Sequence, residues 1–203
     1  MSNNLQPQYS LWPITDCLGR EIWHPSRVLS SFRKLLACKD CELNEHGDRV
    51  LQTVTIIGKK IGLKPKEMAT LRIFSQCHDL GKIYIPDSIL LKKDSFSEKE
   101  RSVMEMHSEI GARLALSVKG ISHISDYILM HHENWDGSGY PLGVKGQDIP
   151  LFCRILSVAD AWDAMINDRP YRKAMSWLDA TEELEKKAGS QFDPEIVDIW
   201  RES

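Results

Sequence analysis

The chain has 203 residues, of which 42% are hydrophobic and 27% are charged, and its formal net charge at pH 7 is -3. This composition is typical of a folded globular protein and excludes a disordered chain, while the small negative charge excludes a general affinity for nucleic-acid polymers or acidic lipid. No apolar run reaches the roughly 20 residues of a membrane span, so we expect no membrane anchor.

Residues 1–40 are expected to form a short, partly irregular leader packed on the rest of the chain. Three prolines and one glycine interrupt its first 25 residues, and a helix with the sequence RVLSSFRKLLA closes it. The N-terminus lacks the basic and apolar regions of a signal peptide and the five cysteines are odd in number, which together predict a cytoplasmic protein. Cys38 and Cys41 have C-x-x-C spacing, but without a second pair two ordinary thiols are favoured over a zinc or redox site.

Residues 41–203 show helical periodicity throughout. The first helix, from about residue 42 to 62, carries an apolar stripe at steps of three and four, formed by Val50, Val54, Ile57 and Ile61. The next helix opens near Pro65, and we expect Gly81 to end it.

Capping signals locate the later helices. Ser97 and Glu100 form an S-x-x-E capping box, Ser176 is expected to cap another helix, and a short helix follows Pro194. Alternation typical of strands is absent. The sequence therefore predicts an all-α bundle.

Five of the seven histidines lie on or beside the core-facing stripes: His46, His78, His107, His131 and His132. A single buried imidazole is usually a hydrogen-bonded core residue. Several imidazoles close together, however, repel one another when protonated and leave unpaired lone pairs when neutral. A metal cation removes both difficulties.

Three carboxylates accompany the histidines. Asp79 follows His78 directly, Asp160 replaces a core residue at the end of an apolar stripe, and Glu42 shares a helical face with His46 at i, i+4 spacing. Five imidazoles and three carboxylates exceed the ligands of one ion, so the sequence predicts two or three divalent metal ions in one cage. Nitrogen and oxygen donors favour iron or manganese over a cysteine-type zinc site, and leave zinc, nickel, cobalt and magnesium open.

An ordered series of motifs is similar to a known family. The motifs are HDLGK at 78–82, MHSEIG around His107, HHENWDGSGYP at 131–141, DAWDAM at 160–165, DRPYR at 168–172 and QFDP at 191–194. From about residue 42 to the end, this series resembles the HD-GYP family of cyclic dinucleotide phosphodiesterases. The resemblance implies an HD-type helical bundle over residues 41–203, preceded by the leader at 1–40.

The resemblance also implies roles for individual residues. Its metal ligands are His46, His78, Asp79, His107, His131, His132 and Asp160, with Glu42 supporting a third ion. Asp79 and Lys82 are the implied catalytic residues, because Lys82 would meet the scissile phosphate. Tyr140, Arg169 and Arg172 would face the substrate. The loop of the HHENWDGSGYP motif would contact ligand or dock onto a GGDEF-type cyclase.

The implied activity is hydrolysis of cyclic di-GMP to pGpG, with the further step to GMP left open, by a metal-activated hydroxide that attacks phosphorus in line with the leaving 3' oxygen. Three alternatives stay open: hydrolysis of cyclic GMP-AMP, a sensor or cyclase-docking module with little turnover, and an iron-dependent oxygenase. The complete ligand set argues against a docking module, and the phosphate-facing Lys82 and arginines argue against an oxygenase.

Smaller roles are also open. Gly137 and Gly139 are expected to supply backbone with positive φ for the turn after the paired histidines. Asp136 and Asp163 would orient imidazoles or loops, although Asp163 has an equal alternative in a local pair. With only a short leader ahead of the bundle, we do not expect regulation through a fused sensory domain.

Overall fold

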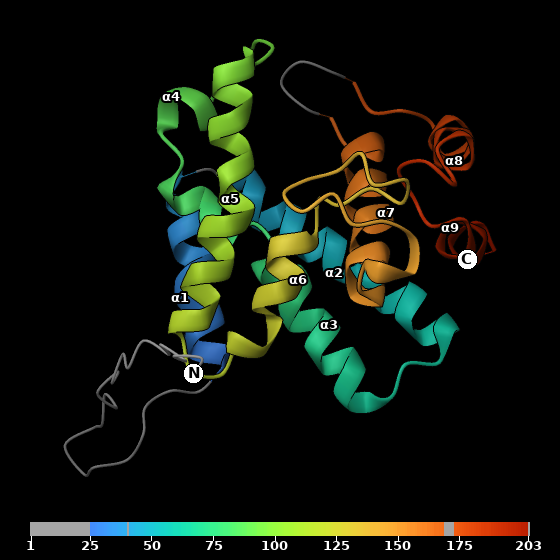
Figure 1. Ribbon diagram of the computed structural model, residues 1–203, viewed down its shortest axis with the longest axis horizontal. Coiled ribbons are helices and arrows are strands. Elements are labelled where there is room, and N and C mark those ends of the chain that lie inside the picture. The colour runs from blue at the N-terminus through green and yellow to red at the C-terminus, as the bar shows by residue number, and fades with distance from the viewer. Residues whose placement is uncertain (1–24, 40, 169–172, 203) are drawn as a thin grey trace, which may run out of the picture.

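The computed structural model describes residues 25–39, 41–168 and 173–202, with side chains from residue 30 and, after residue 40, from residue 45 (Figure 1). Within these ranges the regular elements are helices, and pairing of strands is limited to an isolated bridge between Ala188 and Phe192. The all-α fold expected from the sequence is therefore confirmed. The elements are α1 (Pro25–Lys39), α2 (Cys41–Ile61), α3 (Pro65–Cys77), η1 (Leu80–Tyr84), α4 (Asp87–Leu90), α5 (Glu98–Ser117), η2 (Ser122–Ile124), α6 (Ser125–Met130), η3 (Gly146–Asp148), α7 (Leu151–Ile166), α8 (Trp177–Lys186) and α9 (Pro194–Arg201).

Helix α2 runs through the middle of the bundle and packs against α1, α3 and α7 (Figure 1). Its apolar stripe explains this position, because Val50, Val54 and Ile57 are fully buried. Each such side chain contributes roughly 1.5–3 kcal/mol when it leaves water. The core that they enter also contains Phe74 of α3 and Leu156 of α7.

The capping signals start the helices at the expected residues. The hydroxyl of Ser97 accepts from the Glu100 amide at 3.4 Å, and the Glu100 carboxylate accepts from the Ser97 amide at 2.8 Å, which completes the capping box of α5. Ser176 caps α8 by accepting from the Asp179 amide at 3.2 Å. Among the described helices, none has both the length and the hydrophobicity that a bilayer span requires.

Gly81 does not end α3, contrary to the expectation from the sequence. Helix α3 ends at Cys77, and Gly81 lies inside η1, where a β-carbon would overlap the main-chain oxygen of His107. A residue without a side chain is needed there because η1 packs directly on α5. This close approach brings the junction of α3 and η1, which carries His78 and Asp79, next to His107.

Candidate metal centre

Five helices and their ends bring seven of the expected ligands to one place. His46 comes from α2, His78 and Asp79 from the end of α3, His107 from α5, His131 and His132 from the residues after α6, and Asp160 from α7. Six of these ligands form two groups, and within each group the ligand atoms lie within 4.8 Å of one another. The first group is His107, His131 and His132, and the second is His46, His78 and Asp160. Each group has the composition and spacing to hold a metal ion.

The protonated nitrogen of three imidazoles is fixed by their own helices. The Nδ1 atom of His78 lies 2.8 Å from the main-chain oxygen of Ser75. The same atom lies 2.7 Å from the Met104 oxygen in the case of His107, and 2.6 Å from the Ile128 oxygen in the case of His131. A main-chain oxygen can only accept, so each Nδ1 carries the hydrogen and donates it. In the neutral ring, Nε2 is then a bare lone pair suited to a metal, in the arrangement that metal-binding histidines commonly adopt.

Lone pairs face one another in the first group. Nε2 of His107 lies 3.2 Å from Nε2 of His131 and 3.1 Å from Nε2 of His132. Because His107 and His131 both carry their hydrogen on Nδ1, the two Nε2 atoms are both acceptors and cannot bond to each other. A cation between them would satisfy both.

A proton is a poor substitute for that cation. Burial lowers the pKa of His107 to about 4, and burial together with the neighbouring His107 lowers the pKa of His132 to about 3. Burial and the adjacent imidazoles also hold the pKa of His131 well below its ordinary value. All three rings are thus neutral at pH 7, which is the state that binds a metal.

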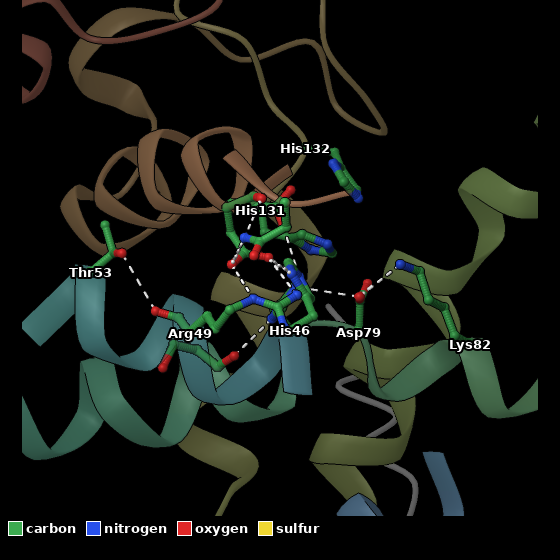
Figure 2. Close-up of polar contacts among 12 residues, drawn as sticks. His46, Arg49, Thr53, Asp79, Lys82, His131 and His132 are labelled. Atoms are coloured by element: carbon green, nitrogen blue, oxygen red, sulfur yellow. Dashed lines mark hydrogen bonds and ion pairs between the residues drawn. The ribbon is translucent and has the colours of Figure 1, made fainter. Parts of the chain in front are cut away.

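Asp79 lies between the two groups. Its Oδ2 is 3.4 Å from Nε2 of His78 in the second group, and its Oδ1 is 3.6 Å from Nε2 of His107 in the first. Figure 2 shows this carboxylate between the Lys82 ammonium and the cluster that contains His46 and His131. One carboxylate with an oxygen toward each group has the form of a bridging ligand.

The Asp79 carboxylate is ionised although it is buried. Burial would raise its pKa, but the ammonium of Lys82, 2.7 Å from Oδ2, and the neighbouring His78 hold that pKa well below its usual range. Lys82 itself keeps 21% of its side chain exposed. It therefore presents a positive charge at the rim of the centre.

Asp163 contacts His46 and also pairs with a residue of its own helix end, so both of its expected roles are present. Nδ1 of His46 lies 2.7 Å from Oδ2 of Asp163, while Nε2 lies 3.0 Å from Oδ1 of Asp160. The Asp163 carboxylate accepts in turn from Nε of Arg49 at 2.6 Å and from the side-chain Nδ2 of Asn167 at 2.9 Å. Burial would lower the pKa of His46, but the carboxylates of Asp160 and Asp163 raise it to about 9.

Not all of the expected substrate contacts fall in the described part of the chain. Arg169 and Arg172 lie outside the described residues, and so does the side chain of Glu42, whose backbone belongs to α2. Tyr140 is described, and its ring stacks on His132 with centroids 4.8 Å apart and planes at 27°. Its amide donates to the His132 oxygen at 3.2 Å, so Tyr140 borders the first group of imidazoles.

The loop after the paired histidines differs in detail from the expectation. Gly137 has a φ of +86°, as expected, but Gly139 is needed for another reason: a β-carbon there would overlap the Asn134 amide and the His132 oxygen. Among the described residues, Asp136 makes no hydrogen bond or ion pair with an imidazole. It accepts from the Ser138 amide at 2.9 Å and shapes the turn.

Two residues with clear roles have no role in the sequence-based interpretation. Arg49 holds Asp163, and its position one turn after His46 was the available signal. Glu133 is 3% exposed, and its Oε1 accepts from the amides of Leu142 at 2.7 Å and Gly143 at 3.2 Å. Glu133 therefore ties down the loop that carries Tyr140.

A cavity of about 540 Å³ opens beside the centre. His131, His132 and Asp160 of the centre line it, together with Asn134, further residues of α7, Met175 before α8, Glu183 of α8 and residues of the turn after α8. Its volume is within the range of small-molecule sites. A ligand that touches the metal centre has room to extend toward α8.

Comparison with known proteins agrees with the fold and the motifs. Similar proteins include a cyclic di-GMP phosphodiesterase from Thermotoga maritima, 36% identical over 175 residues, which span 85% of this chain and 48% of that protein. A 3'3'-cGAMP-specific phosphodiesterase 2 from Vibrio cholerae is 35% identical over 163 residues, which span 79% of this chain and 31% of that protein. The chain thus spans about half or less of the length of these relatives.

Among solved structures, a cyclic GMP-AMP specific phosphodiesterase from V. cholerae has a TM-score of 0.63 and 22% identity, covering 87% of this chain and 48% of that chain. At that identity the likeness shows the fold. The HD domain family matches residues 30–196, which begins inside the segment expected to be a leader, and the boundary at residue 40 stays a prediction. The chain belongs to the HD domain family, and its resemblance to the HD-GYP members is confirmed.

Proposed function

We propose that the chain is a metal-dependent phosphodiesterase that hydrolyses cyclic di-GMP to pGpG. The single observation that carries the proposal is the placement of Asp79 between two groups of neutral or carboxylate-paired imidazoles, with lone pairs of His107 and His131 directed at each other. Such a donor set suits two divalent ions. Relatives named as cyclic di-GMP phosphodiesterases support the substrate.

The residues divide into two proposed ligand sets. His107, His131 and His132 would hold one ion, His46, His78 and Asp160 the other, and Asp79 would bridge them. When bound, two such ions supply the polarisation of the phosphate and the activation of water that in-line hydrolysis requires. Glu42 would support a third ion. The nitrogen and oxygen donors favour iron or manganese.

Lys82 is proposed to bind the scissile phosphate. Its ammonium is at the rim of the centre, held by Asp79 at 2.7 Å, and it is partly exposed to an incoming ligand. A fixed positive charge there stabilises the extra negative charge that develops on phosphate oxygens. Tyr140, stacked on His132, would form a wall of the substrate site, and Arg169 and Arg172 are proposed to contact phosphate or base.

Hydrolysis of 3'3'-cGAMP is the second candidate, because relatives with that printed specificity are also similar to this chain. Both substrates share the phosphodiester that the centre would cleave, and they differ in one base. We also propose a cytoplasmic location, in which the three described free thiols would stay reduced, and docking of the 131–141 loop on a GGDEF-type cyclase.

The test is metal analysis of protein purified without oxygen, coupled to chromatography of the products from cyclic di-GMP and 3'3'-cGAMP. We expect about two ions or more per chain and linear pGpG from cyclic di-GMP. Asp79→Asn should lose both, whereas Asp94→Asn, which removes the same charge from an exposed position, should keep both. Binding of cyclic dinucleotide without a linear product would overturn the enzyme in favour of a sensor.

A further inference from the structure

Helix α7 supplies much of the lining of the cavity beside the metal centre, and Glu183 of α8 and Lys187 directly after it also line it. The two helices are in contact. On α7, Ser157, Ala161 and Ala164 occupy the same stripe as Asp160. These small side chains leave space where larger ones would fill it. The cavity is thus continuous with the metal centre at Asp160 and runs away from it along α7.

The lining combines apolar surface with a charged edge. Met165, Met175 and Phe192 supply apolar contacts of the kind that take up the faces of an aromatic ring. Glu183 and Lys187 line the opposite side and form an ion pair at 3.3 Å. Their side chains are 32% and 44% exposed, so both keep hydrogen-bonding capacity for a ligand.

A pair of this kind matches one nucleobase. Guanine presents two adjacent N–H donors, N1–H and the N2 amino group, which suit the two oxygens of a carboxylate, beside an acceptor, O6, which suits an ammonium. Adenine has an acceptor at N1 and an amino donor at N6, so its N1 lone pair would face the Glu183 carboxylate. The Glu183–Lys187 pair therefore attracts the hydrogen-bonding edge of guanine and repels that of adenine.

We infer that the cavity between α7 and α8 receives a guanine base of the substrate and that Glu183 and Lys187 read its hydrogen-bonding edge. The inference rests on the proposed function for the position of the phosphate, which would be at the metal centre that the cavity shares through His131, His132 and Asp160. It extends that function by assigning the residues that select the base. The other base of a cyclic dinucleotide is left to other contacts, so one guanine is required and the second is not.

Neighbouring residues on α8 offer matched controls. Glu182 and Lys186 are exposed and do not line the cavity, yet each is next in sequence to its counterpart and carries the same charge. Glu183→Gln and Glu182→Gln therefore remove the same charge from the same helix, as do Lys187→Met and Lys186→Met. Any difference in nucleotide binding between the two variants of a pair is then due to the position of one of them in the cavity.

The experiment measures dissociation constants of GMP and AMP for the metal-loaded protein by calorimetry. GMP and AMP carry the same phosphate, so its contribution cancels in the ratio of the two dissociation constants. The ratio therefore measures the preference for the base. We expect GMP to bind roughly tenfold more tightly than AMP, since a good two-point contact to a base discriminates by about 5- to 150-fold. Glu183→Gln and Lys187→Met should bring the ratio to within about twofold of one, while Glu182→Gln and Lys186→Met should retain it.

A ratio near one in the unchanged protein, or an unchanged ratio in Glu183→Gln, would overturn the inference. If Glu183→Gln unfolds, judged by its thermal melt, Lys187→Met decides alone. Product chromatography separates this result from the proposed function. Discrimination between GMP and AMP without hydrolysis of cyclic di-GMP supports the base site and refutes the enzyme, whereas hydrolysis without discrimination does the reverse.

Discussion

The carboxylate of Asp163 lies 2.7 Å from Nδ1 of His46 and also receives Nε of Arg49 at 2.6 Å. It therefore links a proposed metal ligand to a fixed positive charge. Asp163→Asn should weaken binding of the ion held by His46, His78 and Asp160 by about 10- to 100-fold, because the imidazole loses the partner that orients it. Competition with a fluorescent chelator measures the change. Equal affinity in Asp163→Asn and the exposed control Asp94→Asn would refute the role.

Lys82→Met should lower kcat by about 10²- to 10³-fold while the metal content stays, because the charge beside the phosphate is lost but no proposed ligand is. The pKa of Asp79 should rise at the same time, since the Lys82 ammonium is the largest influence that lowers it. Lys93→Met, at an exposed position, is the control. Steady-state kinetics at matched metal content gives the result, and a kcat equal to that of the control would exclude Lys82 from the reaction.

Gly81→Ala should destabilise the protein by about 1–3 kcal/mol and reduce metal binding, since the added methyl group would overlap the His107 oxygen and push η1 away from α5. Gly47→Ala is the matched control, because a β-carbon at Gly47 in α2 meets nothing within 4 Å. Alanine is also the better helix former there by about 1 kcal/mol. Urea unfolding of both variants should therefore give shifts of opposite sign.

Without metal, the free energy of unfolding of the protein should decrease as the pH falls below about 6.5. The folded-state pKa is about 4 for His107 and about 3 for His132, below the ordinary value of 6.5. Between about pH 6.5 and 4, the unfolded chain therefore takes up protons that the folded chain refuses. The free energy of unfolding should drop by up to about 1.4 kcal/mol per pH unit for each of these groups. Urea unfolding with a chelator, repeated across pH, measures this slope.

His46 should act in the opposite direction in the same series. Asp160 and Asp163 raise its folded-state pKa to about 9, so its contribution is full below 6.5 and is lost as pH rises through 9. The metal-free protein should thus be most stable near neutral pH. His107→Gln should flatten the acid side, whereas His123→Gln, an exposed histidine, should leave the profile unchanged. A flat profile for the unchanged protein would contradict the buried, neutral state of these imidazoles.

The sequence predicted the helices and the position of the histidines on or beside their buried faces because both depend on local signals. Apolar stripes define the buried face of α2, and His46 lies one turn before that stripe begins. Contacts across the bundle have no such local signal. The ending of α3 at Cys77 and the need for Gly81 both come from the approach of η1 to α5, which periodicity within one helix cannot reveal. The role of Asp163 likewise depended on α2 and α7 packing together.

The bonds from Nδ1 of His78, His107 and His131 to oxygens three residues earlier mean that folding, and not the ion, sets the direction of these rings. Much of the entropy loss of assembling a coordination sphere is thereby incurred during folding. One divalent ion can then replace another with little movement of the polypeptide. Which ion the protein carries would be governed by what the cell supplies as much as by the shape of the cage.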